Sequence, residues 1–168
     1  TQAEVLTVRV ADGDHVGIGE CVPYARYGES LQSVTDEIMG LPADVTRAAL
    51  QALLPAGAAR NAVDCALWDL EAKASGKPAW ELAGIAEPST CITAYTLSLG
   101  TPDAMQASAA KHSHRPLLKT KLGGGDEDVA RIRAVRTGAP NARIIVDANE
   151  GWTTAQYRTL APVFLELG

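Results

Sequence analysis

The sequence predicts an α/β protein in which a small α+β module precedes repeated strand–helix units. Two observations carry this prediction. A hairpin pattern followed by helical patterns fills the first 88 residues, whereas short apolar strands alternate with amphipathic helices from residue 89 onward. Strands that alternate with helices are typical of a parallel sheet. We therefore expect two domains, at residues 1–88 and 89–168.

The first module opens with a β-hairpin. Residues 5–10 alternate apolar and polar side chains, and residues 15–20 resume the same strand pattern. The Asp-Gly-Asp sequence between them is one that tight turns prefer. A loop at residues 23–30 follows, and its Arg26-Tyr27 pair fits either a plain turn or a lid over a substrate carboxylate.

Helices are predicted after this loop. A helix through Met39 begins after Ser30, which can cap it, and a short helix covers residues 46–53. The strongest helix of the module runs from Ala58 to Ser75, because apolar residues recur along it at helical spacing, and Gly76 ends it. Two tryptophans of this module are expected to pack in the core, Trp68 and Trp80.

Three strand–helix units are predicted from residue 89 onward. The expected strands cover residues 91–97, 117–122 and 143–146. The expected helices run from a cap at Thr101 to Lys111, from a cap at Asp126 onward, and from Thr153 to Leu167. Three strands cannot close a barrel and leave an unpaired edge. The pattern therefore fits a barrel interrupted after its third unit better than a finished open sheet.

Composition excludes several classes of protein. The apolar content of 46% is ordinary for a folded soluble protein, and no uninterrupted apolar run approaches the ~20 residues of a membrane span. A net charge of −5 without a basic stripe argues against a nucleic-acid partner. The three cysteines lack metal-ligand spacing and are odd in number, so we expect neither disulfides nor zinc, and a reducing cytoplasm. Because Thr1 stands where Met would, we expect the chain to begin inside a longer protein.

Lys119 and Lys121 are the residues that point most directly to chemistry. Side chains two positions apart on a strand point the same way, so both amines would enter one space. A Lys-x-Lys pair alone is more often a solvated face, but alternate side chains of a barrel strand face the barrel interior. Lysines there are costly to bury, and neighbouring ammonium groups lower each other's affinity for protons. A lysine of this kind can serve as a base near neutral pH.

Asp147 ends the next predicted strand and would bring a carboxylate to the same rim. It fits either a cap of the following helix or a metal ligand, and the carboxyl end of a barrel strand favours the ligand. A hard oxygen ligand suits Mg²⁺, which needs further carboxylates or water. Asn149 and Glu150 follow too closely to be independent ligands. Two amines facing an anionic metal ligand suit removal of a proton from carbon next to a carboxylate.

Four stretches carry a resemblance to known families. Lys119-Thr120-Lys121 and residues 146–152 (Val-Asp-Ala-Asn-Glu-Gly-Trp) together resemble the enolase superfamily, muconate-lactonizing subgroup. Residues 19–30 and 54–70 closely resemble the bacterial L-Ala-D/L-Glu dipeptide epimerases. The similarity covers essentially the whole chain. It implies an α+β capping domain followed by the first three βα units of an enolase-type (β/α)7β barrel.

The resemblance also implies roles for individual residues. Lys121 corresponds to one of two opposed acid/base lysines, Lys119 sits beside it near the substrate carboxylate, and Asp147 is the first of three carboxylate ligands to one Mg²⁺. The implied substrate-binding residues are Thr96, Arg26 and Tyr27. The remaining ligands, the opposing lysine and the first strand of the cap are expected outside this sequence, so the 168 residues alone are expected to be inactive.

The implied reaction is epimerisation of L-Ala-D/L-Glu-type dipeptides from cell-wall peptides. A lysine removes the α-proton, Mg²⁺ stabilises the resulting enolate, and an opposite lysine returns a proton. The implied partners are the small dipeptide and further copies of the chain, with no nucleic acid and no membrane. Alternatives with the same lysines and metal are N-acylamino-acid racemase, o-succinylbenzoate synthase and muconate cycloisomerase. A non-catalytic module whose strand edge pairs with another chain is a further alternative.

Overall fold

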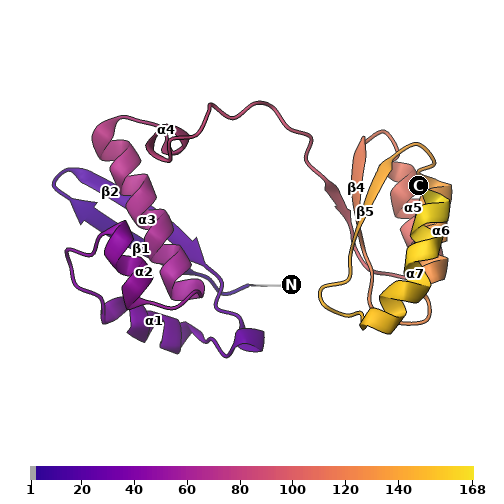
Figure 1. Cartoon of the computed structure of the whole chain (residues 1–168), viewed down its shortest axis with the longest axis horizontal. Helices are drawn as coiled ribbons and strands as arrows, with labels where there is room; N and C mark the ends of the chain where they lie inside the picture. The colour runs from indigo at the N-terminus through magenta and orange to yellow at the C-terminus, as the bar shows by residue number, and fades with distance from the viewer. Residues whose placement is uncertain (1–2) are drawn as a thin grey trace. The chain divides into compact units, whose positions relative to one another are not determined.

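The computed structural model describes residues 3–168, and the chain divides into two compact units, Thr1–Ser89 and Thr90–Gly168. Each unit builds a hydrophobic core of its own (Figure 1). The domain limits predicted from the sequence, 1–88 and 89–168, stay predictions for the whole protein. Residues 1 and 2, which precede the expected strand at residues 5–10, lie outside the described residues.

The predicted hairpin is confirmed in the first unit. Strand β1 (Leu6–Asp12) pairs antiparallel with β2 (His15–Cys21), and Asp12 lies opposite His15. The connection is therefore a two-residue turn, in which Gly13 takes a left-handed φ of 56°. Glycine takes this conformation at little cost, which explains its place in the turn.

The helices predicted for the first unit are confirmed. They are α1 (Leu31–Met39), α2 (Arg47–Leu53) and α3 (Ala58–Ser75). Ser30 and Thr46 cap the first two through their side-chain oxygens, and Gly76 ends α3 in a left-handed conformation. Two short elements were not predicted, the 3₁₀ turn η1 (Ala25–Tyr27) and α4 (Ala79–Leu82).

Small residues on both sides let α3 pack closely on β2. A Cβ atom added to Gly19 would lie 1.9 Å from the carbonyl oxygen of Ala62, and one added to Gly17 would lie 2.0 Å from that of Ala66. Ala62 and Ala66 are both fully buried. The backbone of the helix therefore rests directly on the backbone of the strand, and this contact sets the position of α3 in its unit.

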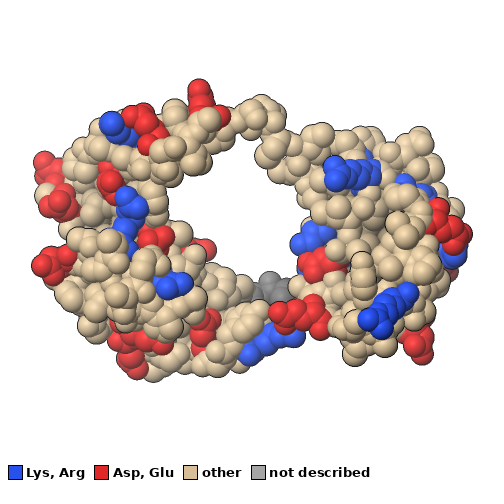
Figure 2. Space-filling view, viewed as in Figure 1, with Lys and Arg blue, Asp and Glu red and all other residues tan. Residues whose placement is uncertain are grey.

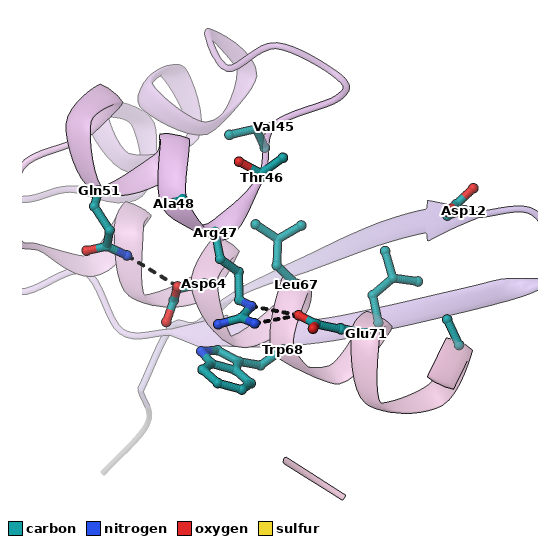
Figure 3. A pocket seen from close by; sticks show the side chains of 12 residues that line it. Asp12, Val45, Thr46, Arg47, Ala48, Gln51, Asp64, Leu67, Trp68 and Glu71 are labelled. Carbon is teal, nitrogen blue, oxygen red and sulfur yellow. Dashed lines mark hydrogen bonds and ion pairs between the residues drawn. The ribbon is translucent and has the colours of Figure 1, made fainter. Parts of the chain in front are cut away.

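The expectation that two tryptophans pack in the core is wrong. Trp68 and Trp80 are only half-buried. Trp68 lines a groove of about 780 Å³ beside α2 and α3 (Figure 3), and the guanidinium carbon of Arg47 lies 3.6 Å from its ring centroid. Arg47 also forms an ion pair with Glu71 at 2.6 Å. Alanines occupy the side of α3 that faces the hairpin, so the large ring of Trp68 lies at the edge of the core.

The second unit is a parallel three-stranded sheet with helices on one side. The strands β3 (Tyr95–Leu97), β4 (Leu117–Lys121) and β5 (Arg143–Asp147) pair in that order. The helices α5 (Pro102–Lys111), α6 (Asp128–Gly138) and α7 (Thr154–Leu167) lie to one side of the strands in Figure 1. The core lies between the sheet and the helices, where Leu97 and Leu118 of the strands pack with Met105 of α5 and Val135 of α6.

Two boundaries in this unit differ from the prediction. The strand expected at residues 91–97 covers only Tyr95–Leu97, the three residues that pair with β4. The helix expected to start at a cap from Asp126 begins at Asp128, and the N-cap position, Glu127, makes no side-chain capping bond. The carboxylate of Asp128 turns back to the preceding loop instead.

Charges of both signs are spread over the surface of each unit. Lys and Arg lie interspersed with Asp and Glu on the face shown in Figure 2. Among residues 3–168, no helix combines the length and the apolar character needed to span a membrane.

The contact between β2 and α3 predicts a large effect of Gly19→Ala. The added methyl group would overlap the carbonyl of Ala62, so we expect the free energy of unfolding to fall by about 2–4 kcal/mol. Urea unfolding of the chain measures the change. Gly40→Ala is the control, because its Cβ would meet nothing closer than 3.4 Å. Equal stability of Gly19→Ala and the parent chain would contradict the proposed packing.

Candidate active site

The predicted site residues of the second unit share one face of its sheet. In the parallel pairing, Thr96 lies opposite Lys119 and Lys121 lies opposite Asp147. Paired residues of neighbouring strands point to the same side, and residues two apart do so as well. The intervening residues Leu118 and Thr120 are fully buried on the helix side. The four polar side chains therefore occupy the face that the helices leave open.

Two ammonium groups meet one carboxylate on this face. The Nζ atoms of Lys119 and Lys121 lie 2.8 and 2.7 Å from the same Oδ2 atom of Asp147. The three side chains keep 36%, 29% and 26% of their area exposed, so solvent and small molecules still reach them. The structure thus brings together the three residues on which the chemical prediction rests. Their roles in a reaction stay predictions.

The charge of Asp147 is fixed by these neighbours. Hydrogen bonds from Lys119, then Lys121, then the backbone N–H of Asn149 hold the pKa of the Asp147 carboxyl far below its usual range. The side chain is therefore ionised at any ordinary pH. Because the pKa of Asp147 is lower in the folded state than in the unfolded chain, the ionised side chain stabilises the fold above the unfolded pKa of about 3.9. This stabilisation is lost as the pH falls from that value through the folded-state pKa.

The turn after β5 adds a residue that the sequence prediction set aside. Asn149 and Glu150 both take left-handed φ angles, 48° and 61°, and the N–H of Gly151 donates to the carbonyl of Ala148 at 2.9 Å. This turn brings the Oδ1 atom of Asn149 within 2.7 Å of Nζ of Lys121. Asparagine tolerates the left-handed region better than most residues, which was the available signal for such a turn.

The expected substrate-binding residues lie in both units. Thr96 is exposed in the middle of β3. In the first unit, Arg26 and Tyr27 lie in the turn η1, where Tyr27 is 68% exposed and its ring lies 5.7 Å from that of Tyr24. The base of this loop is fastened to α3, because Glu29 accepts hydrogen bonds from the backbone N–H groups of Tyr24 and Ala58. Contact of these three residues with a substrate stays a prediction.

Asp147 brings a carboxylate to this face that could take part in binding a metal ion. No group of three or more His, Cys, Asp or Glu side chains that could hold a metal ion occurs within residues 3–168. Asp147 has the hard oxygen atoms that Mg²⁺ prefers, it is ionised, and it is partly exposed. Asp147 is therefore suited to be one of several ligands to a Mg²⁺ ion.

Models of two protein families match most of the chain. The model of the mandelate racemase/muconate lactonizing enzyme N-terminal domain matches residues 1–84, and the enolase C-terminal domain-like model matches residues 103–168. The chain therefore belongs to the mandelate racemase/muconate lactonizing enzyme family of the enolase superfamily. The predicted fold class, an α+β domain followed by the start of an enolase-type barrel, is confirmed.

Several proteins to which the chain is similar are dipeptide epimerases or have homology to them. The L-Ala-D/L-Glu epimerase of Escherichia coli (strain K12) is 44% identical over 176 residues, covering 100% of this chain and 54% of its own length. An enolase family member from Agrobacterium tumefaciens with homology to dipeptide epimerases, solved with bound sodium and L-Ala-L-Glu, is 51% identical. It aligns over 98% of this chain and 52% of its own, with a TM-score of 0.89.

A further solved structure is that of the dipeptide epimerase from Cytophaga hutchinsonii complexed with Mg and the dipeptide D-Ala-L-Val. It is 27% identical, aligns over 96% of this chain and 50% of its own, and has a TM-score of 0.78. The chain thus spans about half the length of the relatives that it matches.

The shared carboxylate predicts a measurable shift of its pKa. Removing one ammonium group by Lys119→Met should raise the pKa of Asp147, because one of its largest stabilising contacts is lost. A ¹³C NMR titration of the Asp147 carboxyl carbon measures the shift. Lys111→Met, which removes an exposed charge from the end of α5, is the control. An unchanged Asp147 titration in Lys119→Met would show that the two side chains do not interact.

Proposed function

We propose that the whole protein to which this chain belongs is an isomerase that epimerises L-Ala-D/L-Glu-type dipeptides at the α-carbon of glutamate. One observation carries the proposal: two lysine ammonium groups converge on one ionised carboxylate on the open face of a parallel sheet. Membership of the family and the 44% identity to an L-Ala-D/L-Glu epimerase support the substrate class. The proposal concerns the whole protein, because the chain spans about half the length of its relatives.

Lys121 is the proposed acid/base on one side of the substrate. In its neutral form the amine takes the α-proton, and in its charged form it returns one. Asp147 and Asn149 hold its Nζ atom at 2.7 Å each, which fixes the direction from which it approaches the substrate. A positioned base of this kind contributes about 10²–10⁴-fold to a rate.

The proposed role of Lys119 is to provide a second positive charge beside Lys121. The Nζ atom of Lys119 shares the Oδ2 atom of Asp147 with Lys121, so the two cations lie close together. A second cation beside Lys121 attracts the carboxylate of a substrate. Thr96 on the same sheet face, and Arg26 and Tyr27 in the first unit, are the proposed substrate-binding residues.

Asp147 is the proposed ligand to Mg²⁺ from this half of the protein. The related epimerase complexed with Mg and a dipeptide supports this assignment, as does the hard, ionised oxygen set of Asp147. When bound, the ion supplies positive charge that stabilises the substrate carboxylate as the neighbouring carbon loses its proton. The carboxylate of Asp147 is the ligand that this chain would contribute to the ion.

The biological setting is proposed from the same evidence. Dipeptides of alanine and glutamate are components of cell-wall peptides, so we propose that the protein acts in their breakdown. Cys21, Cys65 and Cys91 are free thiols, which supports a reducing cytoplasm. A homo-oligomer is the proposed assembly of the whole protein.

The proposed function is tested with the full-length protein and L-Ala-L-Glu in D₂O. Proton NMR should show deuterium entering the glutamate α-carbon together with formation of L-Ala-D-Glu, because the acid on the opposite face that completes the inversion carries deuterium from the solvent. A cycloisomerase or a dehydratase would give neither product. Absence of both deuterium and the epimer with Mg²⁺ present would refute the proposal.

Lys121→Met should lower kcat for L-Ala-L-Glu by about 10²–10⁴-fold, since the acid/base is removed while the other substrate contacts remain. Steady-state kinetics of the full-length variant measure the loss. Lys111→Met again serves as the control and should retain the parent rate. A Lys121→Met enzyme with near-parent kcat would exclude Lys121 from proton transfer.

A further inference from the structure

The second unit contains a buried carboxylate that the proposed chemistry does not use. Asp128, the first residue of α6, is 0% exposed, although it follows a loop at the surface. Burial alone raises the pKa of an acid, but four hydrogen bonds oppose this effect, and the pKa of Asp128 lies below its ordinary value. A buried anion is costly unless it is fully bonded, so its partners show what it holds in place.

The four hydrogen bonds to Asp128 come from three segments of the chain. The backbone N–H groups of Gly123 and Gly124 donate to Oδ1 and Oδ2 at 3.1 and 2.8 Å. The indole Nε1 of Trp152 donates to Oδ2 at 2.9 Å, and Arg131 donates to Oδ1 at 3.1 Å. Asp128 therefore joins the loop between β4 and α6 to the loop between β5 and α7.

Arg131 extends this network to a third loop. Its Nε atom donates to the carbonyl of Gly100 at 2.9 Å, in the connection between β3 and α5. One ion pair, Asp128 with Arg131, thus contacts all three connections that follow the strands of the second unit. These connections leave the strands next to Thr96, Lys121 and Asp147.

Direct contacts between two of the loops leave little room for adjustment. A Cβ atom on Gly124 would lie 2.2 Å from the carbonyl oxygen of Gly151. The side chain of Gln156 donates to the carbonyl of Gly124 at 2.8 Å, and the N–H of Leu122 donates to the carbonyl of Asp147 at 3.0 Å. A shift of the loop after Lys121 would therefore be transmitted to the residues around Asp147.

We propose that Asp128 is a positioning residue, which holds the three loops together through Gly123, Gly124, Trp152 and Arg131 and so sets the approach of Lys121 to Asp147. This inference rests on the proposed function for its consequence in catalysis. Asp128 touches no reacting group itself. A misplacement of about 1 Å at a reacting group costs roughly 10²-fold in rate, which is the scale expected for its loss.

Asp128→Asn in the full-length protein tests the proposal. The amide keeps the shape of the side chain but loses its charge, and its NH₂ group would face the N–H groups that now donate to Asp128. We therefore expect kcat for L-Ala-L-Glu to fall by about 30- to 100-fold while KM changes less than about threefold. Hydrogen–deuterium exchange with mass spectrometry should show faster exchange confined to residues 98–101, 122–127 and 148–153. Exchange in α3 should be unchanged.

Two further variants keep the test decisive. Trp152→Phe removes one hydrogen bond but keeps a ring beside Phe164, so a fall in kcat of about three- to tenfold with unchanged folding is expected. Trp152→Phe tests the positioning role of Asp128 if Asp128→Asn fails to fold. Glu166→Gln is the matched control, because Glu166 also pairs with an arginine of α6, Arg133, but at the surface. It should leave kcat and exchange in the three loops unchanged.

The outcomes separate positioning from a general structural role. Unchanged kcat in a folded Asp128→Asn enzyme would overturn the proposal, as would faster exchange spread evenly over the whole protein. Where Asp128→Asn does not fold, parent kinetics in Trp152→Phe would overturn it. If the unaltered protein does not epimerise the dipeptide, the proposed function fails, and local exchange in the three loops alone then confirms or refutes the role of Asp128.

Discussion

The site depends on the register between two parallel strands. Because Lys121 lies opposite Asp147, the carboxylate of β5 lies beside the amine of β4, and the two-residue period brings Lys119 to the same place. The intervening Leu118 and Thr120 are buried beneath the helices. A shift of one residue would direct both lysines toward the buried side of the sheet, at a large cost in desolvation. Hydrophobic burial on one face therefore enforces the polar cluster on the other.

The surrounding loops hold in place the side chains that this register brings together. The left-handed turn at Asn149 and Glu150 brings an amide oxygen to Lys121, and the buried Asp128 ties the loop after β4 to Trp152. In the first unit, Glu29 has a role like that of Asp128, because it joins the loop that bears Arg26 and Tyr27 to the start of α3. Each loop thus has an acid at its base that accepts backbone hydrogen bonds.

Local sequence patterns predicted the structural features that depend on residues close together in the chain. The helix at Ala58–Ser75 followed from apolar spacing and Gly76, and the convergence of the lysines on Asp147 followed from strand alternation. Features that depend on distant partners were missed. Asp126 and Asp128 look alike as helix-start acids, and only the folded loop shows that Asp128 bonds to Trp152. Asn149 was set aside for its closeness to Asp147, since its contact with Lys121 depends on a left-handed turn.

The central claim is that both amines meet the carboxylate of Asp147 on the open face of the sheet. A crystal structure of the full-length protein, grown with a chelator so that no divalent cation competes for Asp147, tests it most directly. We expect Nζ of Lys119 and Nζ of Lys121 both to lie about 2.7–3.2 Å from the Asp147 carboxylate. Ammonium groups directed into bulk solvent, away from Asp147, would contradict it.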